Sequence, residues 1–162
     1  MDDVDRIVEQ WGRERPDLQT EAMAVFGRIY RLARVVGDRQ EKVYGELGIN
    51  RGEFDVLATL RRAGEPFQLS PKQLSASLML TTGGMTGRLD RLEKAGLAAR
   101  SPDPEDRRGL VITLTARGRE VVDEAVVAGL AAQREVLERL PEAGRRRLSA
   151  LLRDLLAAAE SG

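Results

Sequence analysis

The chain has 162 residues, of which 42% are hydrophobic and 32% are charged, a composition that supports a packed core. Lys and Arg together number 26, Asp and Glu also number 26, and the formal net charge is zero. Cys and His are both absent. Their absence excludes disulfides, thiolate zinc sites, cysteine nucleophiles and histidine-based catalytic triads.

The charge is distributed unevenly along the chain. Residues 61–119 carry 11 basic and 6 acidic side chains, whereas residues 1–60 and 120–162 are both mildly acidic. A basic central segment is typical of a nucleic-acid-binding region. The alternative interpretation of the same excess is an arginine-rich face that only contacts solvent.

Two helices are predicted in the first third of the chain. Apolar residues at helical spacing, including Trp11, predict a helix over residues 3–14. A second, long helix is expected over residues 18–47, because Pro16 precedes it and Gly48 follows it.

The middle of the chain predicts three shorter helices. The stretch 50–53 has the capping-box pattern and predicts a helix over residues 51–63. The stretch 70–73 repeats this pattern with Pro at the first helical position, and predicts a short helix over residues 71–78. A further helix is expected over residues 81–95.

The periodicity then changes from that of helices to that of strands. Residues 97–101 and 110–114 predict a β-hairpin, because they are short, rich in β-forming residues and separated by a loop-forming segment. A helix over residues 116–140 and a final helix after Pro141 complete the chain.

This order predicts a mainly α fold with a small β-hairpin, a winged helix-turn-helix, over residues 48–115. The long flanking helices, in residues 1–47 and 116–162, have apolar faces that need partners. A two-fold dimer would cover them and present two recognition helices to a palindromic DNA site.

The candidate DNA contacts lie on the predicted recognition helix, on the wing and at two other helix starts. Hydroxyls and glycines near a recognition-helix start allow close approach to DNA, and wing arginines suit a narrow minor groove. The expected contacts are Lys72, Thr82, Thr86, Gly87, Arg91, Arg107, Arg108 and Arg117, with Asp106 supporting the wing. The alternatives are helix packing for the glycines and solvent exposure for the charged residues.

Three stretches of the sequence resemble the MarR family of transcriptional regulators: residues 54–60, residues 85–97 and the wing stretch 106–115. The resemblance covers about residues 20–160. It implies a homodimer that binds pseudo-palindromic double-stranded DNA and usually represses transcription. It also implies that a small anionic or aromatic ligand relieves this repression.

The chain is more specifically similar to the urate-responsive, PecS-like subgroup of this family. The resemblance implies a ligand site formed by Trp11, Asp55, Arg88 and Arg100. Guanidinium groups suit a planar anion, and an anion that took an arginine from Asp55 could tilt the recognition helix. A tricarboxylate such as aconitate or citrate would suit the same arginines. The alternatives are core packing for Trp11, a phosphate contact for Arg88 and a wing contact for Arg100.

Two other functional classes compete with this interpretation. An enzyme is not expected, because no carboxylate pair, phosphate-binding loop or histidine accompanies a catalytic motif, and no cofactor or metal is expected either. A helical module that binds another protein and not DNA is the second alternative. The sequence has no apolar run long enough for a membrane span, and it predicts a cytoplasmic protein associated with the nucleoid through DNA.

Overall fold

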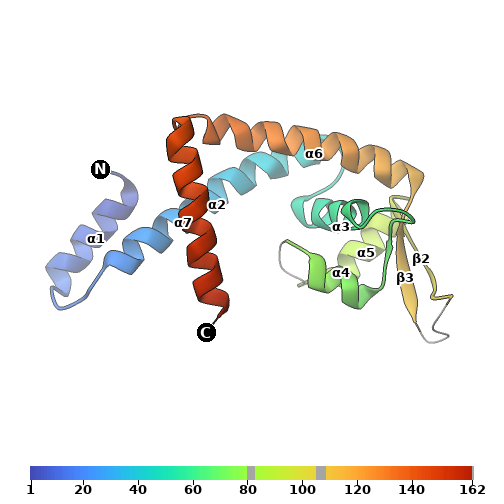
Figure 1. Ribbon diagram of the computed structural model, residues 1–162, viewed down its shortest axis with the longest axis horizontal. Coiled ribbons are helices and arrows are strands. Elements are labelled where there is room, and N and C mark those ends of the chain that lie inside the picture. The colour runs from blue at the N-terminus through green and yellow to red at the C-terminus, as the bar shows by residue number, and fades with distance from the viewer. Residues whose placement is uncertain (80–82, 105–108, 162) are drawn as a thin grey trace. The chain divides into compact units, whose positions relative to one another are not determined.

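The computed structural model describes residues 1–79, 83–104 and 109–161, and it is mainly helical with a small antiparallel sheet (Figure 1). The predicted fold class is therefore confirmed. The helices are α1 (Asp3–Glu14), α2 (Glu21–Glu46), α3 (Arg51–Arg62), α4 (Pro71–Ser77), α5 (Met85–Lys94), α6 (Ala116–Leu137) and α7 (Glu142–Glu160). The strands are β1 (Gln68–Leu69), β2 (Ala98–Pro102) and β3 (Leu110–Leu114). The chain divides into two compact units, residues 1–39 and 40–162.

In the first unit, an aspartate cluster holds α1 against α2. Asp2 caps α1 by accepting the backbone N–H groups of Val4 and Asp5, and Asp5 accepts the backbone N–H of Asp2 in return. Arg28 of α2 donates to both aspartates, with 2.8 Å between its Nε and Asp2 Oδ2. Val4 is buried against Gly27. The start of α1 is thus fixed by charge, a capping box and one apolar contact.

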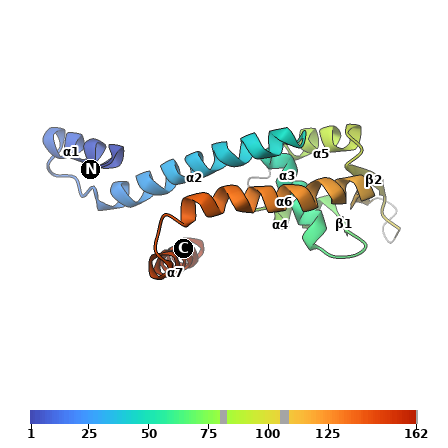
Figure 2. The ribbon, with the colours of Figure 1, turned by 90° about the horizontal axis from the view of Figure 1, so that it is seen from above.

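In the second unit, α3 occupies the centre of the core. Val56, Leu57 and Leu60 are fully buried, and α3 packs against α4, α5, α6 and β3. Figure 2, the view from above, shows α6 passing across α3. The predicted capping box at the start of α3 is confirmed, since Asn50 and Glu53 each accept the other's backbone N–H at 2.9 Å.

The last turns of α2 pack against α3 and α6 through aromatic rings. The Tyr44 ring stacks on Phe54, with 4.3 Å between ring centroids and 14° between planes. Gly129 of α6 makes room for this pair, because a Cβ at position 129 would lie 2.2 Å from the Tyr44 hydroxyl oxygen. A glycine is therefore required where α6 crosses Tyr44.

The sheet has three strands in the order β1–β3–β2, both pairs antiparallel, whereas the sequence predicted only the hairpin. The omitted strand β1 pairs Gln68 with Thr113 and Leu69 with Ile112. A two-residue strand has too few positions to show alternation, so its existence depends on the pairing with β3. The predicted hairpin itself is confirmed, with Ala98 opposite Leu114 and Pro102 opposite Leu110.

Three predicted helix boundaries differ from the structure by three or four residues. Helix α5 begins at Met85 and not at residue 81, because Gly84 at its N-cap has a left-handed φ of 74° that is incompatible with an α-helix. Helix α6 ends at Leu137 and not at residue 140, because the chain approaches Pro141, which disfavours helical conformation in the preceding residue. Helix α2 begins three residues later than residue 18, at Glu21.

We expect Gly129→Ala to lower the free energy of unfolding by about 1–3 kcal/mol, because the new methyl group overpacks the contact with Tyr44. Denaturant unfolding followed by circular dichroism measures this change. Gly45→Ala is the matched control, since a Cβ at that helical position has no neighbouring atom within 4 Å. A Gly129→Ala protein as stable as the control would contradict the predicted clash.

Acid is expected to release α1 from α2. The backbone N–H of Asp5, followed by Arg28, lowers the pKa of Asp2, and the backbone N–H of Asp2, followed by Arg28, lowers the pKa of Asp5. Because both pKa values are lowered on folding, this stabilisation is fully present above the ordinary aspartate pKa of about 3.9. It is lost as the pH falls through the lower folded-state values.

The fluorescence of Trp11, the single tryptophan and a residue of α1, measures this release during an acid titration. Far-UV circular dichroism of the same samples reports unfolding of the rest of the chain. In Arg28→Gln the transition should begin at higher pH, because the aspartates lose their cationic partner. Identical titration curves for the two proteins would show that the cluster does not hold α1.

Candidate nucleic-acid interface

Helix α4, the first helix of the helix-turn-helix, is set by its capping box. The backbone N–H of Ser70 donates to Gln73 Oε1 at 2.9 Å, and the backbone N–H of Gln73 donates to Ser70 Oγ at 3.2 Å. Leu74 is fully buried and attaches α4 to the core. The first turn of α4 therefore has a fixed direction, and Lys72 within it is exposed.

Helix α5, the predicted recognition helix, has one buried and one outward face. Leu89 and Leu92 are buried against the core. Thr86 and Arg91 are exposed, and Gly87 is half-buried. The outward face thus combines a hydroxyl, a residue without a side chain and a cation, which is the chemistry expected of a DNA-reading surface.

One flank of α5 contacts the first turn of α3 through two arginines. Arg91 Nε donates to Glu53 Oε1 at 2.6 Å, and Glu53 uses its other oxygen in the capping box. Arg88 lies over Gly52, since a Cβ at position 52 would be 2.6 Å from Arg88 Nε. The directions of both arginine side chains therefore depend on the start of α3.

The other flank of α5 is joined to the wing by Arg100 of β2. Arg100 Nη2 lies 2.6 Å from Asp90 Oδ1 and 3.4 Å from the Thr86 carbonyl oxygen, and Arg100 Nη1 lies 3.4 Å from Glu93 Oε2. This arginine therefore neutralises the acidic side chains of α5 and ties the helix to the first wing strand.

Helix α3 also holds the end of α4, just before the connection to α5. Asp55 is almost completely buried, and its Oδ1 accepts the backbone N–H of Met79 at 3.1 Å. Arg62 donates to the carbonyl oxygen of Ser77. A movement of α3 would therefore be transmitted directly to the segment that leads into the recognition helix.

A cavity of about 390 Å³ lies between the end of α2, α3 and α6. Its apolar wall includes Tyr44, Phe54, Ala58, Val122, Val126 and Leu130. Its polar groups are Gln40, Asp55, Arg61, Arg62, Asp123 and Gln133. Burial raises the pKa of the Tyr44 hydroxyl. The cavity is large enough for a small organic molecule and offers both an apolar wall and cations.

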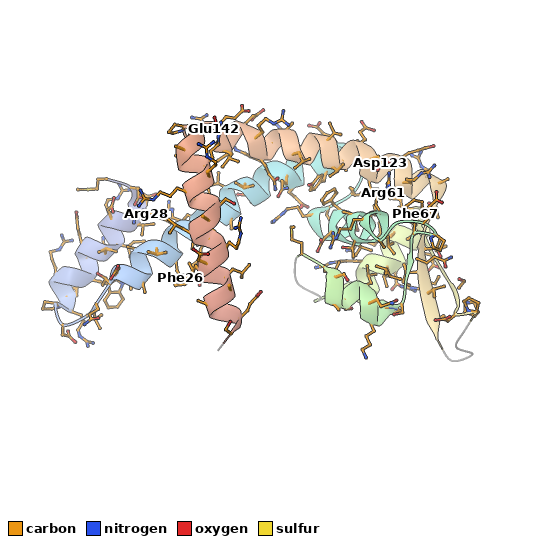
Figure 3. The ribbon with its side chains drawn as sticks, viewed as in Figure 1. Phe26, Arg28, Arg61, Phe67, Asp123 and Glu142 are labelled. Carbon is orange, nitrogen blue, oxygen red and sulfur yellow. The ribbon has the colours of Figure 1, made fainter. Side chains whose placement is uncertain are left out.

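Arg61 is a cation of this cavity that is held by two other segments of the chain. Its Nε lies 2.8 Å from Asp123 Oδ1 of α6, and its guanidinium stands 5.3 Å from the ring centre of Phe67 (Figure 3). Arg119 of α6 approaches the same ring at 5.8 Å. Sequence reasoning missed Arg61, because its partners are contributed by segments that only the fold brings together.

The remaining candidates lie in both units of the chain. Lys72 and Arg117 are exposed in the first turns of α4 and α6. The predicted ligand residues Asp55, Arg88 and Arg100 lie in α3, α5 and β2 of the second unit, whereas Trp11, 43% exposed, belongs to the first unit. The candidates Thr82, Asp106, Arg107 and Arg108 lie outside the described residues.

Residues 1–79, 83–104 and 109–161 contain neither a candidate metal site nor a candidate membrane span. Within these ranges, no group of three or more acidic side chains is placed to hold a metal ion. None of the helices in the same ranges has the length and apolar character needed to cross a membrane.

Comparisons with known proteins agree on one family. Residues 47–109 match the description of the MarR family. The HTH-type transcriptional regulator PecS of Dickeya dadantii (strain 3937) is 39% identical over 150 residues, which cover 93% of this chain and 90% of PecS.

Solved structures show the same similarity. A mutant MarR from E. coli, complexed with operator DNA, matches with a TM-score of 0.74 and 25% identity over 85% of this chain and 96% of that chain. A MarR family transcriptional regulator from Streptomyces coelicolor matches with a TM-score of 0.75 and 26% identity, covering 88% of this chain and 98% of that chain.

We expect the Arg100–Asp90 ion pair to contribute about 0.2–1 kcal/mol to stability, since Asp90 is largely exposed. A double-mutant cycle with Arg100→Gln and Asp90→Asn, measured by denaturant unfolding, gives this coupling. The coupling should decrease at high salt, because exposed charges are screened. Additive effects of the two substitutions at low salt would contradict the proposed tie between β2 and α5.

Proposed function

The chain belongs to the MarR family of transcriptional regulators, and from this membership we propose that it binds a pseudo-palindromic operator in double-stranded DNA as a homodimer. The observation that carries the proposal is the outward face of α5, held between α3 on one flank and β2 on the other. A helix fixed on both flanks can enter a major groove without rearrangement. The MarR relative complexed with operator DNA supports the same role.

The proposed DNA contacts follow from exposure and position. Thr86, Gly87 and Arg91 of α5 would face the major groove, and Lys72 and Arg117 would contact phosphates from exposed helix starts. On sequence grounds Thr82 joins the recognition surface, and Arg107 and Arg108, supported by Asp106, form the wing tip. These last four residues lie outside the described part of the chain.

The proposed dimerisation region comprises residues 1–47 and 116–162, and residues 48–115 form the proposed DNA-binding region. Helix α7 has no buried residue, although it carries Leu151, Leu152, Leu155 and Leu156. On α6, Val127 and Leu130 are also exposed. Exposed apolar side chains of this kind favour association, and a second copy of the chain would cover them.

We further propose that the protein represses transcription and that a small organic anion attenuates its DNA binding. The resemblance to the PecS-like subgroup implies that a urate-like anion binds at Trp11, Asp55, Arg88 and Arg100. A tricarboxylate is the second candidate ligand. Asp55 also lines the cavity between α2, α3 and α6 and holds the Met79 backbone. A ligand that changes the surroundings of Asp55 could therefore move Met79, in the segment that connects α4 to α5.

Fluorescence anisotropy of labelled DNA from the gene's own upstream region tests the proposal. Wild type should bind this DNA with an affinity that falls steeply as salt is raised. Arg91→Ala should weaken binding, whereas Arg146→Ala, which removes an exposed arginine paired with Glu142, should not. Failure of the wild type to bind any such DNA would favour the protein-interaction alternative.

The effector is tested by adding urate or trans-aconitate to the preformed complex. Release by urate alone supports the purine-like assignment, and release by trans-aconitate alone supports the tricarboxylate. Asp55→Asn should blunt the response to whichever ligand acts, because it removes the charge on which the coupling depends. An unchanged ligand response in Asp55→Asn would count against this site.

A further inference from the structure

We propose that Glu53 is a positioning residue for DNA recognition, which fixes the guanidinium of Arg91 with the carboxylate oxygen that is not used to cap α3. This inference rests on the proposed function, since it assumes that α5 reads DNA. It goes further by assigning sequence discrimination in part to a residue of α3, a helix that lies outside the proposed DNA-reading face.

The first observation is the full use of the Glu53 carboxylate. Its Oε2 accepts the backbone N–H of Asn50 at 2.9 Å, and its Oε1 accepts Arg91 Nε–H at 2.6 Å. The Glu53 side chain is only 9% exposed. A carboxylate buried to this extent needs partners for its charge, and Arg91 supplies the cationic one. Glu53 is therefore held in place at the start of α3 and holds Arg91 in turn.

The second observation is that Arg91 itself remains accessible. Its side chain is 57% exposed, and its Nη1 lies over Gly87, where an added Cβ would stand 3.5 Å away. A guanidinium has a rigid planar fork of donors, so fixing Nε fixes the plane of the whole group. The terminal nitrogens are then directed along the outward face of α5 before DNA arrives.

The consequence is preorganisation of a bidentate donor. An arginine that contacts the O6 and N7 atoms of guanine, or two phosphate oxygens, must hold its fork in one plane. A freely rotating side chain loses conformational entropy when it is ordered in this way, and an already fixed one loses less. Discrimination between base pairs also increases, because the Arg91 guanidinium cannot rotate to accommodate a wrong base.

This pair differs from an ordinary surface ion pair of the same chain. Glu142 and Arg146 of α7 are both about 70% exposed and lie one helical turn apart, an arrangement that restrains neither side chain strongly. Glu53 and Arg91 come from different helices, and one partner is buried. The competing explanation is that Glu53 only stabilises the packing of α5 on α3, and the test must separate the two roles.

Glu53→Gln separates the positioning role from the packing role, because a glutamine can cap a helix but offers only one oxygen. The chain contains this arrangement already, since Gln73 Oε1 accepts the backbone N–H of Ser70 in the capping box of α4. In Glu53→Gln the amide oxygen can keep the bond to Asn50, and the amide nitrogen then faces Arg91 Nε–H as a second donor. The cap of α3 is retained and Arg91 is released.

The experiment compares full-length wild type, Glu53→Gln, Arg91→Ala and the double variant on operator DNA and on a scrambled duplex. The measured quantity is the ratio of the two affinities at one salt concentration. Glu53→Gln should lower this ratio about threefold to tenfold, the range that corresponds to the cost of ordering one long side chain on binding. In the Arg91→Ala background the same substitution should have no further effect.

Glu41→Gln is the matched control, because the Glu41 carboxylate also accepts a backbone N–H at the start of α3, that of Arg51, at 3.0 Å. This control removes the same charge from the same region and should leave the affinity ratio unchanged. Thermal unfolding should show similar stability for both glutamine variants. A second measurement needs no DNA: the ¹H–¹⁵N resonance of Arg91 Nε should shift and exchange faster with water in Glu53→Gln.

The possible results distinguish the inference from the proposed function. An affinity ratio within twofold of wild type in Glu53→Gln overturns the inference while leaving the proposed function intact. A loss of the ratio that persists in the Arg91→Ala background also overturns it, because Glu53 would then act only through packing. A wild type that does not distinguish the operator from the scrambled duplex overturns the proposed function together with this inference.

Discussion

The burial of α3 is the constraint on which the second unit depends. Val56, Leu57 and Leu60 are fully buried, and α4, α5, α6 and β3 pack on this helix. Because α3 is surrounded, its buried polar side chains cannot be satisfied by bulk water and need protein partners. The Thr59 hydroxyl returns to the Asp55 carbonyl oxygen of its own helix, at 2.6 Å. The two buried carboxylates of α3 instead find partners on neighbouring elements.

Those partners belong to the proposed DNA-reading elements. Glu53 binds Arg91 of α5, and Asp55 binds the backbone of Met79 after α4. On the opposite side, Arg61 binds Asp123 of α6. The same helix therefore determines the position of the proposed recognition surface and contacts α6, a helix of the proposed dimerisation region. A structural change at the cavity beside α3 can therefore reach α5 through the hydrogen bonds on the two sides of α3.

The electrostatic character of the interface also depends on pairing. The sequence shows a basic middle segment, but it does not show which charges of that segment are available to a phosphate. Arg100 is largely engaged by Asp90 and Glu93, and it serves to cancel the acidic side chains of α5. Arg91 is engaged on one side and exposed on the other. The excess of positive charge is thus only partly a measure of the charge that DNA would meet.

The sequence by itself determined the helices and their order, because capping and periodicity are local properties. The capping boxes at Asn50 and Ser70 and the hairpin over β2 and β3 are encoded within a few residues of where they act. Only the tertiary structure decided the strand β1, the partner of Arg91 and the cavity beside Tyr44. Each of these joins segments far apart in the chain, and a local pattern carries no information on which distant group completes a hydrogen bond, a strand pair or a cavity wall.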